Sequence, residues 1–181
     1  DAYILRMGNL MPRFKDGVFQ ENISENAYIN RLVGFIKVGL LPEYLKDIYL
    51  ELTPIDTSAN SIIKLITHPS DNNRVFHLFN DNHVYLKQFI KYLEKLNPNF
   101  EVVNENIFKN KIKKLLNNPN KKDFINSLAN DFDKDLHFNY FTDIIIKSDI
   151  TKTYLDKIGF SWPKINKNYL NRFIDLLRKV L

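Results

Sequence analysis

The chain has 181 residues, enough for one domain with a sizeable buried core, and its 26 basic and 21 acidic residues give a net charge of +5. It contains no cysteine, which excludes disulfides, thiol catalysis and cysteine-based zinc sites and is compatible with a reducing, cytoplasmic compartment. No apolar run approaches the roughly 20 residues of a membrane span, and no signal-peptide layout opens the sequence, so we expect a soluble protein without a membrane partner.

The first 28 residues predict a strand, a turn, a loop and the start of a helix. An apolar run over residues 3–7 ends at Gly8-Asn9, as expected where a strand leaves a sheet in a sharp turn. Residues 11–22 have no helical or strand period and include a proline and a glycine, which predicts a long loop. Long ordered loops often carry binding residues, so this segment is a candidate for function.

A helix of about four turns is expected next, because apolar residues recur at helical spacing from Tyr28 to Ile36. Asn22 or Ser24 can cap its start, and Gly39 is the expected end.

Residues 48–53 alternate between apolar and other side chains, which predicts a half-buried strand that ends at Thr53-Pro54. Asp56 is the expected cap of a helix over residues 57–68. The apolar residues of this helix share one face: Ala59, Ile62, Ile63 and Ile66. Residues 75–79 look like a strand buried on both faces, and a helix between two such strands indicates a βαβ arrangement.

The rest of the chain is mainly helical, with two apolar stripes at helical spacing within residues 86–116. Residues 100–103 are expected to form a small strand, whereas residues 140–146 fit a strand or a buried helix equally well. Thr151 is the expected cap of a short helix that Gly159 ends, and a last amphipathic helix follows.

Much of the basic excess lies in one cluster. The solvated face of a helix explains such a cluster better than nucleic-acid binding, because no aromatic or glycine motif for nucleic acid accompanies it. Docking to an acidic protein remains an alternative. The cluster consists of Lys109, Lys111, Lys113, Lys114, Lys121 and Lys122.

Several catalytic patterns are absent from the sequence. The five glycines never give the spacing of a dinucleotide-binding turn, and none of the nine tyrosines has a lysine at the fourth following position. The histidines lack the spacing of metal ligands, and the serines lack a glycine-flanked nucleophile elbow. We therefore predict no metal site and no catalytic residue, and we expect no reduction by this chain alone.

Three separated segments together resemble a known family. The first is Arg6-Met-Gly-Asn-Leu10, continued by Asp16-Gly-Val-Phe-Gln20, Asn22 and Glu25-Asn-Ala27; the second is Leu52-Thr-Pro-Ile-Asp56; the third is Gly159-Phe-Ser-Trp-Pro163. In this order and spacing they resemble the terminal thioester reductase domains of nonribosomal peptide synthetases, which belong to the extended short-chain dehydrogenase/reductase family.

The resemblance implies an α/β fold. Residues 1–10 and 56–80 would be the remnant of a doubly wound, Rossmann-type parallel sheet for the cofactor. Residues 11–55 and 81–181 would form a mainly helical C-terminal lobe for substrate binding and carrier docking.

The resemblance also implies site residues. Gly8, Asn9 and Leu10 would lie near the nicotinamide of the cofactor, and the loop and helix start would face the substrate channel. From the residues alone, an ordinary tight turn, loop packing and helix-start hydrogen bonds explain these positions equally well. The implied substrate-binding residues are Phe19, Gln20, Asn22 and Asn26.

In such reductases, hydride from NAD(P)H goes to the thioester carbonyl of a carrier-bound peptidyl or acyl chain, a tyrosine protonates the oxygen, and the phosphopantetheine thiol leaves. The released product is an aldehyde or an alcohol. The glycine-rich turn and the catalytic Thr/Ser, Tyr and Lys would precede Asp1. The chain is thus expected to be a C-terminal fragment that is inactive alone and binds NADPH poorly.

The expected partners are the N-terminal half of the same domain, an acidic carrier protein with its phosphopantetheine arm, and further copies of the chain through an exposed sheet edge. Two alternatives remain open. One is a non-catalytic module that binds a carrier protein through the basic cluster. The other is a part of a different extended short-chain enzyme, such as an acyl-CoA reductase or a sugar-nucleotide epimerase.

Overall fold

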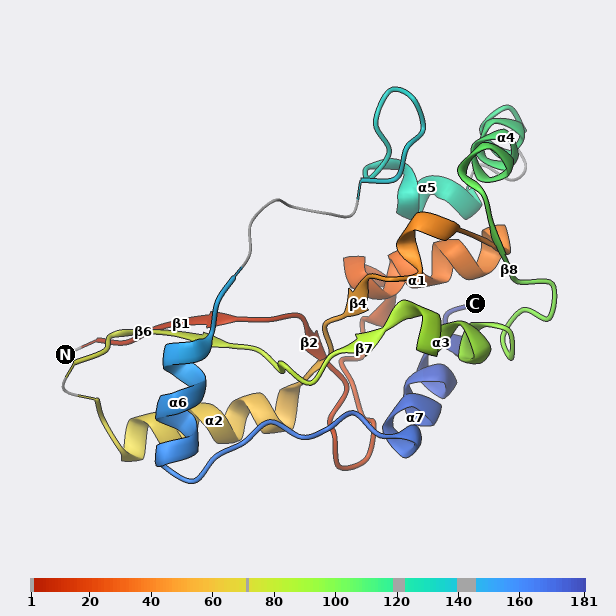
Figure 1. Cartoon of the computed structure of the whole chain (residues 1–181). Coiled ribbons are helices and arrows are strands. Elements are labelled where there is room, and N and C mark those ends of the chain that lie inside the picture. Colours follow the sequence, from red (N-terminus) through yellow and green to blue (C-terminus); the bar gives the residue numbers. More distant parts are fainter. Residues whose placement is uncertain (1, 71, 119–122, 140–145) are drawn as a thin grey trace. The chain divides into compact units, whose positions relative to one another are not determined.

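The computed structural model describes residues 2–70, 72–118, 123–139 and 146–181 (Figure 1). The chain forms two compact units: the first comprises residues 1–20, 50–84 and 144–172, and the second comprises residues 21–49, 85–143 and 173–181. Short parallel strand pairs and seven α-helices within the described residues confirm the α/β class. The division into a cofactor domain and a substrate lobe stays a prediction.

A parallel strand pair forms the centre of the first unit. β1 (Ile4–Met7) runs beside β6 (Val75–Leu78), with Ile4 opposite Val75 and Met7 opposite Leu78. The two strands were expected to belong to one parallel sheet, and they do. The expectation that β6 is buried on both faces is wrong, because Phe76 and Leu78 are buried whereas Val75 is 40% exposed.

The expected strand over residues 48–53 is interrupted. β4 (Tyr49–Leu50) and β5 (Thr53–Pro54) are separate, and β5 pairs in parallel with β2 (Leu10–Met11). Glu51 and Leu52 lie between them and belong to neither strand. The Glu51 carboxylate accepts hydrogen bonds from Asn9. β4 and β7 (Val84–Tyr85) each include one boundary between the two units.

Helix α2 (Ile55–Thr67) starts two residues earlier than a cap at Asp56 would place it. Pro54 occupies the N-cap position, so Asp56 lies in the first turn and the expected capping role is wrong. The buried residues of α2 are Ser58, Ser61 and Leu65, whereas Ile63 and Ile66 are exposed. Of the expected apolar face, Ile62 is half-buried and packs against the core, whereas Ile63 and Ile66 are turned away from it.

Helix α6 (Asp149–Lys157) begins after Ser148, so the expected cap at Thr151 is also wrong. Thr151 is buried inside the helix, where its Oγ1 accepts a hydrogen bond of 2.9 Å from the backbone N–H of His77 in β6. Gly159 follows the helix with a φ of +73°, a left-handed conformation that glycine adopts without strain, and confirms the expected end.

The core of the first unit joins α2, β6 and α6. Leu65, Phe76, Leu78, Leu155 and Phe160 form one buried cluster. Trp162 meets Phe160 edge-on, with ring centroids 5.1 Å apart. The cluster lies on one face of the β1–β6 pair. The last helix, α7 (Lys167–Arg178), follows the Gly159-to-Pro163 segment in the chain.

The second unit is built around α1 (Ala27–Val38), which packs against α5 (Asp123–Ala129). Gly34 allows this close approach, since a Cβ there would lie 2.5 Å from Ser127 Oγ. Gly39 ends α1 with a φ of +77°, as expected. The remaining elements are η1 (Ile23–Glu25), β3 (Leu40–Pro42), η2 (Glu43–Leu45), α3 (Leu86–Leu93), β8 (Glu101–Val103) and α4 (Glu105–Leu116).

The structure decides two expectations for this unit, the strand over residues 100–103 and the start of the first helix, whereas a third falls mainly outside the described residues. The small strand over residues 100–103 is confirmed as β8, which pairs in parallel with β3. The choice between strand and helix for residues 140–146 lies almost wholly outside the described residues. The helix start, by contrast, was misassigned: Asn26 is the cap, because its Oδ1 accepts the Ile29 N–H at 3.0 Å.

Replacing Asn26 with alanine is expected to lower the free energy of unfolding by about 1 kcal/mol, because the Ile29 N–H at the helix start loses its side-chain acceptor. Urea unfolding followed by circular dichroism measures the loss. The matched control is Asn22→Ala, since Asn22 makes no side-chain capping hydrogen bond to η1. Equal losses for both variants would contradict the assignment of the cap.

Candidate functional site

The Gly8-Asn9 turn at the end of β1 is held by Glu51. One carboxylate oxygen accepts the Asn9 backbone N–H at 2.8 Å, and the other accepts Asn9 Nδ2 at 3.1 Å. The Thr53 hydroxyl donates to Glu51 at 2.8 Å. A Cβ at Gly8 would lie only 1.9 Å from Glu51 Oε1 and 2.6 Å from Phe79 Cβ. The turn therefore requires glycine for reasons of space.

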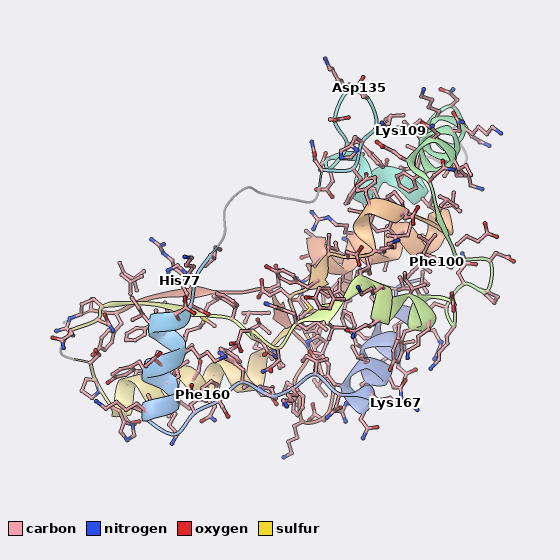
Figure 2. All side chains as sticks on the ribbon, in the orientation of Figure 1. His77, Phe100, Lys109, Asp135, Phe160 and Lys167 are labelled. Atoms are coloured by element: carbon pink, nitrogen blue, oxygen red, sulfur yellow. The ribbon has the colours of Figure 1, made fainter. Side chains whose placement is uncertain are left out.

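A hollow of about 350 Å³ opens beside this turn. It lies toward the carboxyl ends of β1 and β6, which is where parallel α/β sheets bind ligands. Arg6 and His77, opposite each other in the strand pair, supply nitrogen donors (Figure 2 labels His77). The lining residues are Arg6, Met7, Gly8, Asn9, Glu51, His77, Phe79 and Ile146.

Two of the three predicted cofactor residues line this hollow. Gly8 and Asn9 line it, whereas Leu10 lies in β2 opposite Thr53 and is not among the lining residues. Phe19 is half-buried and Gln20 is exposed at the end of the first unit. Asn22 and Asn26 belong to the second unit, where Asn22 donates to Glu25 at 2.7 Å and Asn26 caps α1.

Asn80 connects the segments that carry the family resemblance. It is 1% exposed, and its Nδ2 donates to the carbonyls of Leu52 at 3.2 Å and Pro163 at 3.1 Å. Its backbone N–H donates to the Thr53 hydroxyl at 2.9 Å. Through Thr53 and Glu51 this network reaches Asn9. Residues of all three segments thus meet in the first unit, whereas Asn22 and residues 25–27 of the first segment belong to the second unit.

The sequence reasoning missed Asn80 because it follows a predicted strand without a recognisable motif. The available signal is the run Asn80-Asp81-Asn82, since such residues after a strand often bind their own backbone in turns. Asn80 Oδ1 accepts the Asn82 backbone N–H at 3.0 Å, which is such a turn. Nothing local in the sequence indicates the contacts with Leu52 and Pro163.

The loop that follows the turn is fixed at several points. The Asp56 carboxylate accepts the backbone N–H groups of Phe14 at 2.8 Å and Lys15 at 3.1 Å. The Tyr169 hydroxyl donates to the Pro12 carbonyl at 3.0 Å, and its ring stacks on Phe14 with centroids 5.6 Å apart. Burial, reinforced by the Asp56 charge, raises the pKa of Tyr169, so the hydroxyl stays protonated and donates.

Replacing Asp56 with alanine should loosen this loop without unfolding the unit, because Tyr169 still donates to Pro12 O and Arg172 Nη2 still donates to Phe14 O at 2.6 Å. We expect trypsin to cut after Arg13 and Lys15 about tenfold faster, which corresponds to roughly 1–2 kcal/mol of lost local stability. Mass spectrometry of the first fragments measures the rates. Asp47→Ala, an exposed carboxylate of the second unit, is the control and should leave them unchanged.

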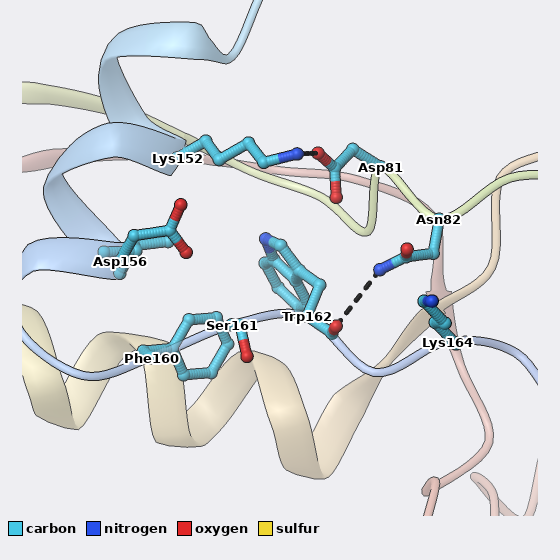
Figure 3. A pocket seen from close by; sticks show the side chains of 9 residues that line it. Asp81, Asn82, Lys152, Asp156, Phe160, Ser161, Trp162 and Lys164 are labelled. Atoms are coloured by element: carbon cyan, nitrogen blue, oxygen red, sulfur yellow. Dashed lines mark hydrogen bonds and ion pairs between the residues drawn. The ribbon is translucent and has the colours of Figure 1, made fainter.

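A second hollow of about 250 Å³ lies between α6 and the Gly159-to-Pro163 segment (Figure 3). Lys152 forms an ion pair with Asp81, and this hydrogen bond raises the pKa of Lys152. Asn82 Nδ2 donates to the Trp162 carbonyl at 3.0 Å. The lining residues are Asp81, Asn82, Lys152, Leu155, Asp156, Phe160, Ser161, Trp162 and Lys164.

The basic cluster lies on α4 as far as the structure describes it, and Lys121 and Lys122 fall outside the described residues. Lys109, labelled in Figure 2, is half-buried and pairs with Glu105 at 2.7 Å. The described residues hold no group of three or more His, Cys, Asp or Glu side chains that suits a metal ion. No helix among them is long and apolar enough to cross a membrane.

Comparison with known proteins gives matches only among solved structures; no family model and no curated protein matches. The thiolation-reductase di-domain of an archaeal nonribosomal peptide synthetase aligns with 98% of the chain, with a TM-score of 0.81 and 28% identity. The terminal R domain of the myxalamid pathway (TM-score 0.73, 19% identity) and the reductase domain of the aureusimine cluster (0.71, 17%) also align with 98% of the chain.

The chain spans less than half of the length of these solved structures: 36% of the archaeal chain, 43% of the myxalamid domain and 44% of the aureusimine domain. The similarities extend over nearly all of the chain and confirm the resemblance carried by the three sequence segments.

Proposed function

We infer that this chain, which folds as part of a nonribosomal peptide synthetase reductase domain, works as the C-terminal portion of an NAD(P)H-dependent thioester reductase. The parent domain would release a carrier-bound peptidyl or acyl thioester as an aldehyde or alcohol. The observation that carries the proposal is the similarity to the archaeal reductase, at 28% identity over 98% of the chain. The hydrogen bonds that join residues of the three segments near the Gly8-Asn9 turn support it.

The residues present fit one end of the cofactor. NADPH, when bound, supplies the hydride that reduces the thioester carbonyl. Gly8 and Asn9 would line the nicotinamide end, because both border the hollow beside the turn. The hollow of about 350 Å³ is too small for a whole dinucleotide, and none of the five glycines forms a pyrophosphate-binding turn. Leu10 would support the turn from β2.

On the substrate side, we assign the channel wall to the loop and helix start that follow. Phe19 would contact the acyl chain, and Gln20 and Asn22 would bind its amide groups. Asn26 would contribute through its Nδ2 group, because its Oδ1 holds the start of α1. The chain would supply no catalytic proton donor, so the tyrosine of the reaction would lie in the rest of the domain.

The partner proposed for the parent domain is an acidic carrier protein with a phosphopantetheine arm. The archaeal relative combines a thiolation domain with its reductase domain. α4 presents Lys111, Lys113 and Lys114 on its exposed surface, which favours a second candidate function, a non-catalytic carrier-binding module. Titration with holo-carrier should then show binding that weakens as salt rises. No binding at low salt would remove the carrier-docking role of α4.

The direct test of the reductase proposal compares the chain with a protein extended upstream in the gene by about 250 residues. We expect the extended protein to oxidise NADPH with acyl-pantetheine thioesters and the chain alone to show no turnover. The extended protein with Gly8→Ala is the control, and it should lose most of the activity while still binding carrier. An extended protein that neither binds NADPH nor reduces the thioester would contradict the proposal.

A further inference from the structure

The second hollow, between α6 and the Gly159-to-Pro163 segment, has no role in the proposed reductase chemistry. It holds about 250 Å³ and shares no lining residue with the hollow beside the turn. Its floor is apolar, because the buried side chains of Leu155 and Phe160 and the half-buried ring of Trp162 line it. Ligand pockets commonly combine such a floor with a few polar groups that set the specificity. The polar groups of this hollow therefore decide which ligand fits.

Some of these polar groups are held by contacts within the first unit. Asn82 Nδ2 donates to the Trp162 carbonyl at 3.0 Å and to Asn80 Oδ1 at 3.2 Å, so two hydrogen bonds fix this amide. Lys152 of α6 forms an ion pair with Asp81, which ties the helix to the segment after β6. A binding site whose walls are held by such supporting contacts keeps its shape without a ligand.

Other polar groups at the hollow have no hydrogen bond or ion pair with any residue that the structure describes. They include the Asp156 carboxylate, the Lys164 ammonium and the indole N–H of Trp162. Figure 3 shows Asp156 and Lys164 on opposite sides of Trp162. Since Lys152 is engaged by Asp81, one negative and one positive charge are left to recognise a ligand.

We propose that this hollow binds a small zwitterion with an apolar body, of the size and chemistry of a free apolar or aromatic amino acid. The ammonium group of the ligand pairs with Asp156, its carboxylate pairs with Lys164, and its side chain lies on the apolar floor against Trp162. A pocket for a drug-sized ligand holds about 300–1,000 Å³, so a smaller molecule suits this one. The proposal does not rest on the reductase function.

Trp162 reports occupancy of the hollow directly, because it is the single tryptophan of the chain. Titration of the chain with L-phenylalanine, followed by tryptophan fluorescence, should saturate with a Kd on the order of 1 mM, as expected for a ligand with so few atoms. Phenethylamine and 3-phenylpropanoate each lack one of the two charges and should bind about fivefold more weakly.

Two variants assign the charged groups of the site. Asp156→Asn should weaken phenylalanine binding about fivefold and leave 3-phenylpropanoate binding unchanged, since that compound has no ammonium group. Lys164→Gln should weaken the binding of phenylalanine and 3-phenylpropanoate about fivefold and leave phenethylamine binding unchanged. Both residues are exposed, so the variants should fold as the chain does.

Asp149→Asn and Lys157→Gln are the matched controls, because both residues are exposed on α6 and neither lines the hollow. They should leave all three affinities unchanged. A fluorescence change that does not saturate with phenylalanine at about twenty times the expected Kd overturns the proposal. Equal affinities for the three compounds, or equal losses in the controls and in the two variants, also overturn it, since the charges at the hollow would then not select the ligand.

Discussion

Replacing Asn80 with alanine is expected to lower the free energy of unfolding of the first unit by about 3 kcal/mol. The side chain donates to Leu52 O and Pro163 O and accepts two hydrogen bonds from Asn82. Alanine removes all four and leaves two carbonyls without this donor at a site that is 1% exposed. A buried acceptor without a partner costs more than the net gain of the original hydrogen bond.

The measurement is urea unfolding followed by Trp162 fluorescence, because Trp162 is the single tryptophan and belongs to the first unit. This choice reports one unit even if the two unfold separately. Asn60→Ala, at an exposed position of α2, is the matched control and should change stability by less than about 0.5 kcal/mol. A loss below 1 kcal/mol for Asn80→Ala would show that the network is not what joins the three segments.

Replacing Gly8 with alanine is expected to cost about 2–3 kcal/mol and to displace the Glu51 carboxylate from the turn. The added methyl group would lie 1.9 Å from Glu51 Oε1, 2.6 Å from Phe79 Cβ and 2.9 Å from Thr53 Oγ1. The glutamate can rotate away, but a Cβ atom moves only with its backbone. The double variant with Glu51→Ala should therefore recover only part of the loss.

Gly159→Ala is the contrasting control for Gly8→Ala. No atom lies within 4 Å of a Cβ at Gly159, and its cost should come only from the left-handed backbone, about 1 kcal/mol. Gly159→Asn should cost less still, since asparagine tolerates that conformation. Thermal unfolding of the variants gives the order directly. If Gly159→Ala proved as damaging as Gly8→Ala, close packing would not explain the glycine in the turn.

Local patterns predicted much of the fold. The apolar runs of β1 and β6 and the left-handed glycines at positions 39 and 159 were found from sequence because each depends on neighbouring residues. The caps were not. Three cap-forming residues, Asn22, Ser24 and Asn26, precede α1, and propensity alone does not choose among them.

The orientation of α2 could not be predicted from the sequence for a different reason. Helical periodicity identified Ile63 and Ile66 as members of one face, but it does not say whether the chain itself supplies a cover for that face. The buried serines run against the usual preference, and only their contacts with backbone carbonyls explain them. An apolar face predicts burial, yet Ile63 is 58% exposed and Ile66 is 64% exposed.

In the candidate site too, residues with a local sequence signal were predicted and residues with distant partners were not. Gly8 and Asn9 were found because a turn after a strand has a local signature, and the hollow lies beside them. Asn80 and Glu51 were missed, since their partners lie tens of residues away in the chain. The roles of Phe19, Gln20, Asn22 and Asn26 stay predictions.

The hydrogen bonds that complete the first unit also set an order of events during folding. Asn80 and Pro163 are 83 residues apart, and Tyr169 and Pro12 are 157 apart. Contacts between such distant positions require large loops to close, which slows folding. During synthesis, the contacts of the turn with Glu51 and of the loop with Asp56 can form first, whereas the contact between Pro12 and Tyr169 forms only after most of the described chain has been made.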